Sequence, residues 1–316
     1  MKIALVCMLV AVAPAMAQSY PAKPIRLLST LGGGAEGLHR ATMQKAAEAL
    51  GQPIVMETQS AANGMVAGEM TARAAPDGYT LLLAVPGSMV VRGFLTRVMP
   101  YQPVKDFSPI TLAAYSVSAI TAHPDYSLKT LKELIETSRI GTRKATFATN
   151  GIGASDHLAG ELINQMTGAG LLHVPHKVQT QAVTAVLGRE VDTYFGVLAG
   201  TGTLVASGKL KALAYVNVRP PVGADASVPV VRDVVPGFES PPYWQGYFGP
   251  AGMPQPVLRR LNSEFVKALI APDIRPKFEA LNNQVVANSP EEFTAMLYAD
   301  LERVGRIVKA AGIKPE

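Results

Sequence analysis

The feature that most constrains the fold is the alternation of short apolar, strand-forming runs with helical stretches. Ile25–Leu28 is followed by a helical pattern over Leu38–Leu50 and by a second apolar run over Ile54–Glu57. This order predicts α/β architecture with largely parallel sheets. Further strands are expected at Tyr79–Val85, Ala145–Ala148, Leu171–Val174, Thr193–Phe195 and Leu210–Val216.

Two helix starts can also be predicted from local chemistry. Thr130 and Glu133 form a capping box before an apolar pair. Ser289-Pro290-Glu291-Glu292 places a cap, a proline at the first helical position and a glutamate at the third. Both signals are structural and carry no functional information.

The N-terminus has the pattern of a secretory leader. Lys2 supplies a positive start, Ile3–Val12 is an unbroken apolar run, and Ala15-Met16-Ala17 is a small-residue cleavage site. We expect export to the periplasm by the general secretory route, with the mature chain beginning at Gln18. An uncleaved anchor is the alternative, although the run is short for a hydrocarbon layer of about 30 Å.

Length and cysteine content limit the chemistry of the mature chain. The sole cysteine, Cys7, lies inside the predicted leader, which leaves no thiol for a disulfide, a nucleophile or a metal. The remaining length favours two lobes, because single cores stop growing at about 250–300 residues. We predict a leader over residues 1–17, one lobe from 18–118 plus 219–316, and a second from 119–218. Val117–His123 and Leu210–Val216 are the candidate crossing strands.

A glycine-rich loop invites an enzymatic interpretation. Gly32–Gly37 satisfies G-x-G-x-x-G after a strand, with Glu57 at the end of the next strand, which is a dinucleotide-binding pattern. Export away from the nicotinamide pool argues against an NAD-linked oxidoreductase. The backbone N–H groups of such a loop, at a helix N-terminus, bind a carboxylate as readily as a phosphate. A tight turn without a ligand is the alternative.

A second donor-rich loop spans Thr149–Ser155, between a predicted strand and a helical pattern over His157–Met166. Ser155 or Asp156 could instead serve only as a helix cap. Open α/β sheets bind ligands at the carboxyl ends of their strands. One such loop per lobe therefore predicts a clamp around a polar anion.

Hydrolytic and metal-dependent functions have weaker support. Ser155, Asp156 and His157 are adjacent, whereas the members of a catalytic triad converge from separate places, and no G-x-S-x-G elbow is present. The five histidines include no HExxH pair. The net charge of +5 is mild and its Lys and Arg residues are scattered, which does not indicate nucleic-acid binding. We expect no enzyme activity, no cofactor and no metal.

Several short stretches together resemble the Bug family, the TctC-like substrate-binding receptors of tripartite tricarboxylate transporters. The resemblance covers essentially the whole predicted mature chain. Its matching stretches are Tyr20–Arg26, the glycines 32–34, Ala75–Leu82, Lys105–Pro109, His157–Leu162, His173–Pro175, Gly208–Ala214, Pro236–Glu239, Gly249–Gly252 and Ser289–Phe293.

The resemblance implies a type II periplasmic-binding-protein fold, in which two α/β lobes joined by hinge-crossing strands close on a carboxylated solute. Its partners would be transporter subunits in the membrane or a sensor protein, and a monomer is expected. Ser155 and Thr149 are the expected direct carboxylate donors. The full predicted ligand-binding set is Gly32, Gly33, Gly34, Gly87, Ser88, Thr149, Asn150, Gly151, Gly153, Ala154, Ser155, His176, Gly196 and Tyr243.

Several positions depart from the usual family pattern near the expected ligand. Glu36 stands in place of an aspartate, His176 in place of a tyrosine, and Gly196 in place of an aspartate or asparagine. Lost polar groups in a retained fold suggest a less polar or aromatic acid. Tyr243 and Trp244 could stack on such a ligand, although a core or hinge role for Trp244 is equally consistent with the sequence.

Overall fold

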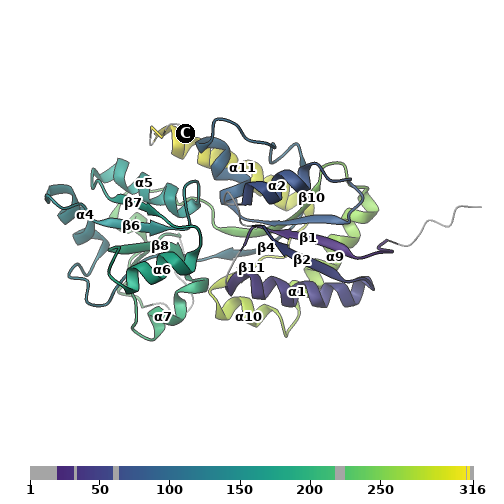
Figure 1. The fold of residues 1–316 in the computed structure, drawn as a ribbon, viewed down its shortest axis with the longest axis horizontal. Helices are drawn as coiled ribbons and strands as arrows, with labels where there is room; N and C mark the ends of the chain where they lie inside the picture. Colours follow the sequence, from purple (N-terminus) through teal and green to yellow (C-terminus); the bar gives the residue numbers. More distant parts are fainter. Residues whose placement is uncertain (1–19, 32–33, 60–63, 218–224, 311, 314–316) are drawn as a thin grey trace, which may run out of the picture.

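Two separate β-sheets, each covered by helices, lie side by side along the long axis of the molecule (Figure 1). The structure is a computed structural model and describes residues 20–31, 34–59, 64–217, 225–310 and 312–313. The predicted leader lies outside these residues. Among the described residues, no helix combines the length and the apolar character needed to cross a membrane.

The first sheet has six strands in the order β11-β4-β10-β3-β1-β2. Its strands are β1 (Ile25–Ser29), β2 (Ile54–Thr58), β3 (Thr80–Ala84), β4 (Phe107–Ser116), β10 (Trp244–Pro250) and β11 (Asn283–Val285). The strand β1 runs parallel to both β2 and β3, as its apolar sequence predicts for a strand buried between helical layers. The strand β10 returns late in the chain and pairs antiparallel with β3 and β4.

The second sheet has five strands in the order β7-β6-β8-β5-β9. They are β5 (Ser118–Ala122), β6 (Thr146–Thr149), β7 (Leu172–Pro175), β8 (Thr193–Val197) and β9 (Lys211–Tyr215). The strand β6 pairs parallel with β7 and β8, and β5 pairs antiparallel with β8 and β9. The predicted α/β class is confirmed.

Helices cover both faces of each sheet (Figure 1). In the first lobe these are α1 (Gly34–Leu50), α9 (Gln255–Ile270) and α10 (Arg275–Ala280) on one face, with α2 (Met65–Ala72) and α11 (Pro290–Ala310) on the other. The second lobe carries α4 (Leu131–Ile140), α5 (Ser155–Thr167), α6 (Gln179–Leu187) and α7 (Gly202–Ala206). Short turns complete the chain: the π-turn η2 (Gly87–Val91), α3 (Arg92–Leu95), the 3-10 turn η3 (Leu198–Gly200) and α8 (Val231–Val234).

The chain first crosses between the sheets through a single residue, Val117, which separates β4 from β5. Asn217 holds this crossing on both sides, because its side-chain oxygen accepts from the Ser118 amide at 2.6 Å and its nitrogen donates to the Ser116 carbonyl at 3.1 Å. The range Leu210–Val216 contains the strand β9 of the second sheet, and the chain leaves that sheet after it. Residues 218–224 lie outside the described part, and the lobe boundaries stay a prediction.

The predicted helix starts are present. The Thr130 hydroxyl accepts from the Glu133 amide at 3.1 Å, and the Glu133 carboxylate accepts from the Lys129 amide. Ser289 and Glu292 bond reciprocally, with the Ser289 hydroxyl accepting from the Glu292 amide. These caps satisfy backbone donors that a helix start would otherwise leave unpaired.

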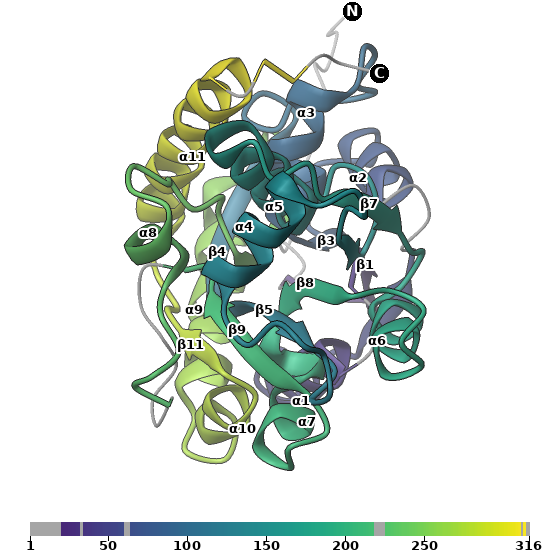
Figure 2. The same cartoon turned by 90° about the vertical axis from the view of Figure 1, so that its left-hand side faces the viewer.

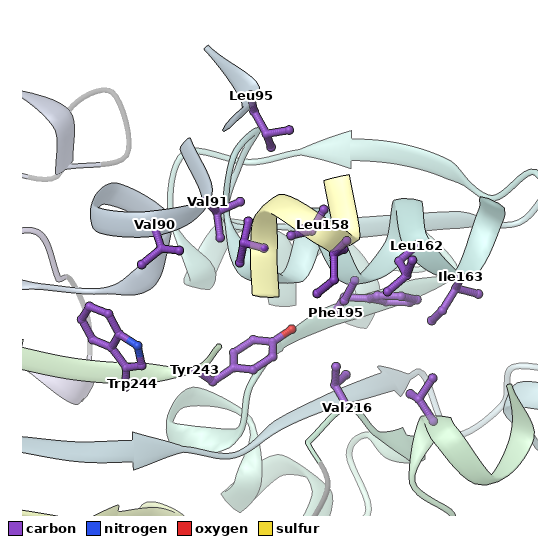
Figure 3. Packing of buried hydrophobic residues seen from close by; sticks show 14 of the residues in the cluster. Val90, Val91, Leu95, Leu158, Leu162, Ile163, Phe195, Val216, Tyr243 and Trp244 are labelled. Atoms are coloured by element: carbon purple, nitrogen blue, oxygen red, sulfur yellow. The ribbon is translucent and has the colours of Figure 1, made fainter. Parts of the chain in front are cut away.

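One hydrophobic cluster joins the two lobes (Figure 3). Val90 and Val91 of η2 belong to it together with Leu158 of α5. Trp244 points toward Val90, whereas Tyr243, the residue before it, points toward the side of Leu158 (Figure 3). Trp244 is 2 % exposed and its indole donates to Asp300 at 2.8 Å, which gives it a core role.

Candidate ligand-binding cleft

A cleft with a cavity volume of about 170 Å³ lies between the two sheets. Both lobes contribute to it, and the size suits a small solute because sites for drug-sized ligands usually measure about 300–1,000 Å³. Its lining comprises Thr30, Leu31, Ala35, Val85, Pro86, Gly87, Ser116, Asn150, Ala154, Ser155, Asp156, Lys177, Val178, Gln179, Thr180, Val197, Tyr243, Trp244 and Gln245.

The first lobe presents the carboxyl ends of its parallel strands. Thr30 and Leu31 follow β1, and Val85–Gly87 follow β3 and lead into η2. Side by side in the sheet, β1 and β3 bring both loops to one edge. The buried Thr30 hydroxyl has no hydrogen-bond partner among the described residues, which leaves a polar group for a ligand or water at this wall.

The second lobe presents the start of two helices. Ala154, Ser155 and Asp156 lie at the start of α5, and Gln179 and Thr180 lie at the start of α6. The cap positions of both helices make no side-chain hydrogen bond to the first turn. The positive dipole ends of both helices therefore lie at the cleft without a side-chain cap, which favours an anion there.

The predicted site residues divide into three groups. Five line the cleft: Gly87, Asn150, Ala154, Ser155 and Tyr243. Six lie nearby without lining it: Ser88, Thr149, Gly151, Gly153, His176 and Gly196. Gly34 begins α1, while Gly32 and Gly33 lie outside the described residues.

Local hydrogen bonds explain why some predicted hydroxyls do not reach the cavity. The Thr149 hydroxyl bonds the His173 ring at 2.7 Å and accepts from the Gly151 amide at 3.1 Å. The Ser88 hydroxyl donates to the carbonyl of Val85 at 3.0 Å. Both side chains form hydrogen bonds within the chain next to the cleft, and neither lines the cavity. Their part in ligand binding stays a prediction.

Ser155 forms a contact at the cleft that the sequence did not reveal. Its hydroxyl donates to the carbonyl of Pro242 at 2.8 Å. Pro242 lies two residues before β10 of the first sheet. The single hydroxyl hydrogen is therefore engaged in this structure, while the oxygen still accepts. Direct donation from Ser155 to a ligand stays a prediction.

Gly196 has a steric role. An added Cβ there would lie 1.9 Å from the ring of Tyr194, which occupies that space. The buried Tyr194 phenol then reaches Asn150, donating to its side-chain oxygen at 3.2 Å. The space beside Gly196 is thus filled by a tyrosine ring from the same strand.

Asp156 is a functional candidate that the sequence analysis considered only as a helix cap or as a member of a rejected catalytic triad. It is 4 % exposed, lines the cleft, and accepts from the Ser118 hydroxyl at 2.9 Å. Burial raises the pKa of Asp156 to about 7, opposed by the Ser118 hydrogen bond and the nearby Tyr243 hydroxyl. The available signal was a carboxylic acid directly after the donor-rich loop Thr149–Ser155.

Gln245 connects the cleft to the core of the first lobe. Its amide nitrogen donates to Ser116 at 2.8 Å, and its oxygen faces Nε2 of the buried His39. Because an amide oxygen only accepts, His39 carries its hydrogen on Nε2 and accepts from the Tyr247 phenol at Nδ1. Burial lowers the pKa of His39 to about 4, opposed by the hydrogen bond to Gln245.

Three histidines gather behind the Gly151–Gly153 turn. The rings of His157 and His173 lie 4.3 Å apart between centroids, and burial with the charges of His157 and His176 lowers the pKa of His173 to about 3. The Gly153 amide donates to Nδ1 of His157 at 3.4 Å. Across the part of the chain that is described, no group of three acidic, histidine or cysteine side chains is placed to hold a metal.

A cleft between two α/β lobes, with helix N-termini on one wall and strands that lead from one sheet to the other, defines a two-lobed solute-binding protein of the type II periplasmic-binding-protein fold. Residues 38–313 match the tripartite tricarboxylate transporter family receptor. The chain belongs to this family, and the resemblance to the Bug proteins is confirmed.

Relatives match over nearly their whole length. The chain is 30 % identical over 295 residues to the UPF0065 protein in the tcbD-tcbE intergenic region of Pseudomonas sp. strain P51, covering 92 % of this chain and 87 % of the relative. The solved structure of periplasmic binding protein BugD is 28 % identical, with a TM-score of 0.85, covering 94 % of this chain and all of BugD. MatC from Rhodopseudomonas palustris with bound malate is 25 % identical, with a TM-score of 0.84, and the match covers 92 % of this chain and 100 % of MatC.

Proposed function

We propose that this protein is an exported receptor that captures a small organic acid in the cleft and presents it to membrane transporter subunits. The observation that carries the proposal is the start of α5 and α6 at the cleft without side-chain caps. The positive dipole ends of these two helices favour a bound carboxylate without a buried arginine. The malate found in MatC is an acid of this kind.

Binding and lobe closure are coupled in this proposal. Contacts already join the two lobes: Arg92 of the first lobe donates to the Ile152 carbonyl of the second at 3.3 Å, and Ser155 donates to the Pro242 carbonyl at 2.8 Å. On the far side, Gln165 of α5 donates to the carbonyl of Ala310 at the end of α11 at 2.7 Å (Figures 1 and 2). A ligand that contacts both walls stabilises the closed form by its differential affinity alone.

The protein does no chemistry in this account. Ser155 and His157, the pair that a hydrolase would use, engage the Pro242 carbonyl and the Gly153 amide. A transporter or a sensor protein would recognise the closed lobes, and the family favours the transporter. The predicted leader is the basis for proposing export. N-terminal sequencing of the protein from the periplasm tests this step, and we expect the mature chain to begin at Gln18.

A thermal unfolding screen tests the proposed function. The panel contains mono-, di- and aromatic carboxylates, with NAD as the comparison compound. A ligand present at about 100 times its dissociation constant should add roughly 2.7 kcal/mol to the free energy of unfolding. A shift with one acid and none with NAD supports the receptor. The absence of any shift with acids, together with a shift by NAD, contradicts it.

A further inference from the structure

Asp156 is an unusual group for a cleft that favours anions. It lies in the first turn of α5, beside Ser155, and 4 % of its surface is exposed. An ionised carboxylate accepts about four hydrogen bonds. The Ser118 hydroxyl donates to it at 2.9 Å, and the Tyr243 hydroxyl is near enough to lower its pKa. Asp156 therefore has acceptor capacity left at the cavity.

The groups around Asp156 do not neutralise it. Tyr194 and Tyr243 face it as buried phenols, and burial first, with the Asp156 charge second, raises the pKa of both well above the usual value. Both phenols are therefore uncharged, and Tyr194 already donates to Asn150. Lys177 is the cation among the cleft-lining residues, and it is exposed at the rim. A buried carboxylate without a positive partner is costly unless a donor reaches it.

A second polar group at the same place lacks a partner. The Tyr243 hydroxyl is buried, lines the cleft, and makes no hydrogen bond with the described residues. It points toward the second lobe, on the side of Leu158 (Figure 3). Buried hydroxyls without partners mark positions that a ligand or an ordered water satisfies. The Asp156 carboxylate can accept a hydrogen bond from a polar substituent of the ligand. The Tyr243 hydroxyl can donate to the same substituent or accept from it.

We infer, on the basis of the proposed function, that Asp156 is a specificity-determining residue that accepts a hydrogen bond from the ligand. The ligand is then an acid that carries a hydroxyl or ammonium group close to its carboxylate. Closeness follows from the helix, because Asp156 shares its first turn with the N–H groups that bind the carboxylate. An acid without such a donor would leave Asp156 desolvated and unpaired, which selects against it.

Matched sets of acids test this inference by isothermal titration calorimetry at pH 8, above the pKa of about 7 of Asp156. One set is succinate, malate and aspartate, and another is propionate, lactate and alanine. We expect the best donor-bearing member to bind at least tenfold tighter than the plain acid of its set. Comparing the affinity of the hydroxyl-bearing acid with that of the ammonium-bearing acid in each set shows which of the two donors Asp156 accepts from.

Variants assign the preference to Asp156. In Asp156→Ala the tenfold preference should fall to about twofold or less. In Asp156→Asn it should persist for a hydroxyl donor, because the amide oxygen still accepts, and fall for an ammonium donor. Asp125→Ala, at an exposed carboxylate paired with Arg189 outside the cleft lining, is the control and should change nothing. Unfolding curves of each variant verify that it is folded.

The outcomes distinguish the two proposals. Tight binding of plain acids with no preference in the wild-type protein overturns the role of Asp156 and leaves the receptor function standing. An unchanged preference in folded Asp156→Ala overturns it as well. If no acid of any set binds, both the receptor function and the inference are wrong.

Discussion

Tyr194 shapes the cleft wall from a position that its sequence does not mark as functional. It is fully buried, spans the space above Gly196, and reaches Asn150 at the cleft. A side chain at 196 and the ring of Tyr194 exclude each other. The Tyr194 ring therefore requires glycine at position 196.

The Gly196→Ala variant tests this packing. The added methyl would lie 1.9 Å from the Tyr194 ring and force it from its position, and overpacking of this kind costs about 1–3 kcal/mol. Urea unfolding should show that loss. Gly93→Ala is the matched control, since nothing lies within 4 Å of its added methyl in α3, and it should be neutral or slightly stabilising. Equal stability of the two variants would refute the account.

His39 makes the stability of the protein depend on pH. Its folded pKa of about 4 lies below the ordinary 6.5, so between these values the unfolded chain binds more protons than the folded protein. Stability therefore falls as the pH decreases from 6.5, by about 2 kcal/mol at pH 5 from this residue. In His39→Gln this part of the pH dependence should disappear. An unchanged slope of unfolding free energy against pH would contradict the prediction.

At this scale the sequence located the loops of the site more reliably than the side chains within them. Thr149 and Ser88 form local hydrogen bonds and Gly196 packs against the Tyr194 ring, and the part of all three in ligand binding stays a prediction. Asp156 and Gln245 were missed as site residues because their roles depend on partners distant in sequence, Ser118 and His39.

The elements that build the cleft are the hinge crossing and the starts of α5 and α6. Apolar alternation predicted most strands well, including β1, β2, β6 and β8. The strands β4 and β10 were not predicted as strands. Gly246, Gly249 and Pro250 break the apolar pattern of β10, and its place between β3 and β4 depends on pairing across more than a hundred residues.

The hinge makes a prediction at this scale. Asn217→Ala removes the acceptor of the buried Ser118 amide and the donor to Ser116, which should cost about 1–3 kcal/mol. Asn217→Asp keeps the acceptor and should recover part of this loss. Chemical denaturation measures both variants. Identical, wild-type stability in both would show that Asn217 does not hold the crossing.

For the whole molecule, the account depends on two lobes that share a cleft and a hydrophobic seam. The seam packs η2 of the first lobe against α5 of the second, and the start of α5 lies beside that of α6 in the cleft lining, where we propose that an anion binds. Residue types and spacing predicted the two-sheet α/β architecture, and the class of ligand stays a proposal. The carboxylate specificity depends on how the lobes meet, which local sequence patterns do not encode.

The central claim is that a small acid binds in this cleft, and one affinity comparison tests it most directly. Val178, a partly exposed residue of the lining, is replaced by Trp to fill the cavity, and Leu172, exposed on β7 away from the lining, is replaced by Trp as the control. Calorimetric titration with the best acid of the screen should show at least a tenfold loss for Val178→Trp and wild-type affinity for Leu172→Trp. Wild-type affinity in both variants would place the ligand elsewhere and contradict the account.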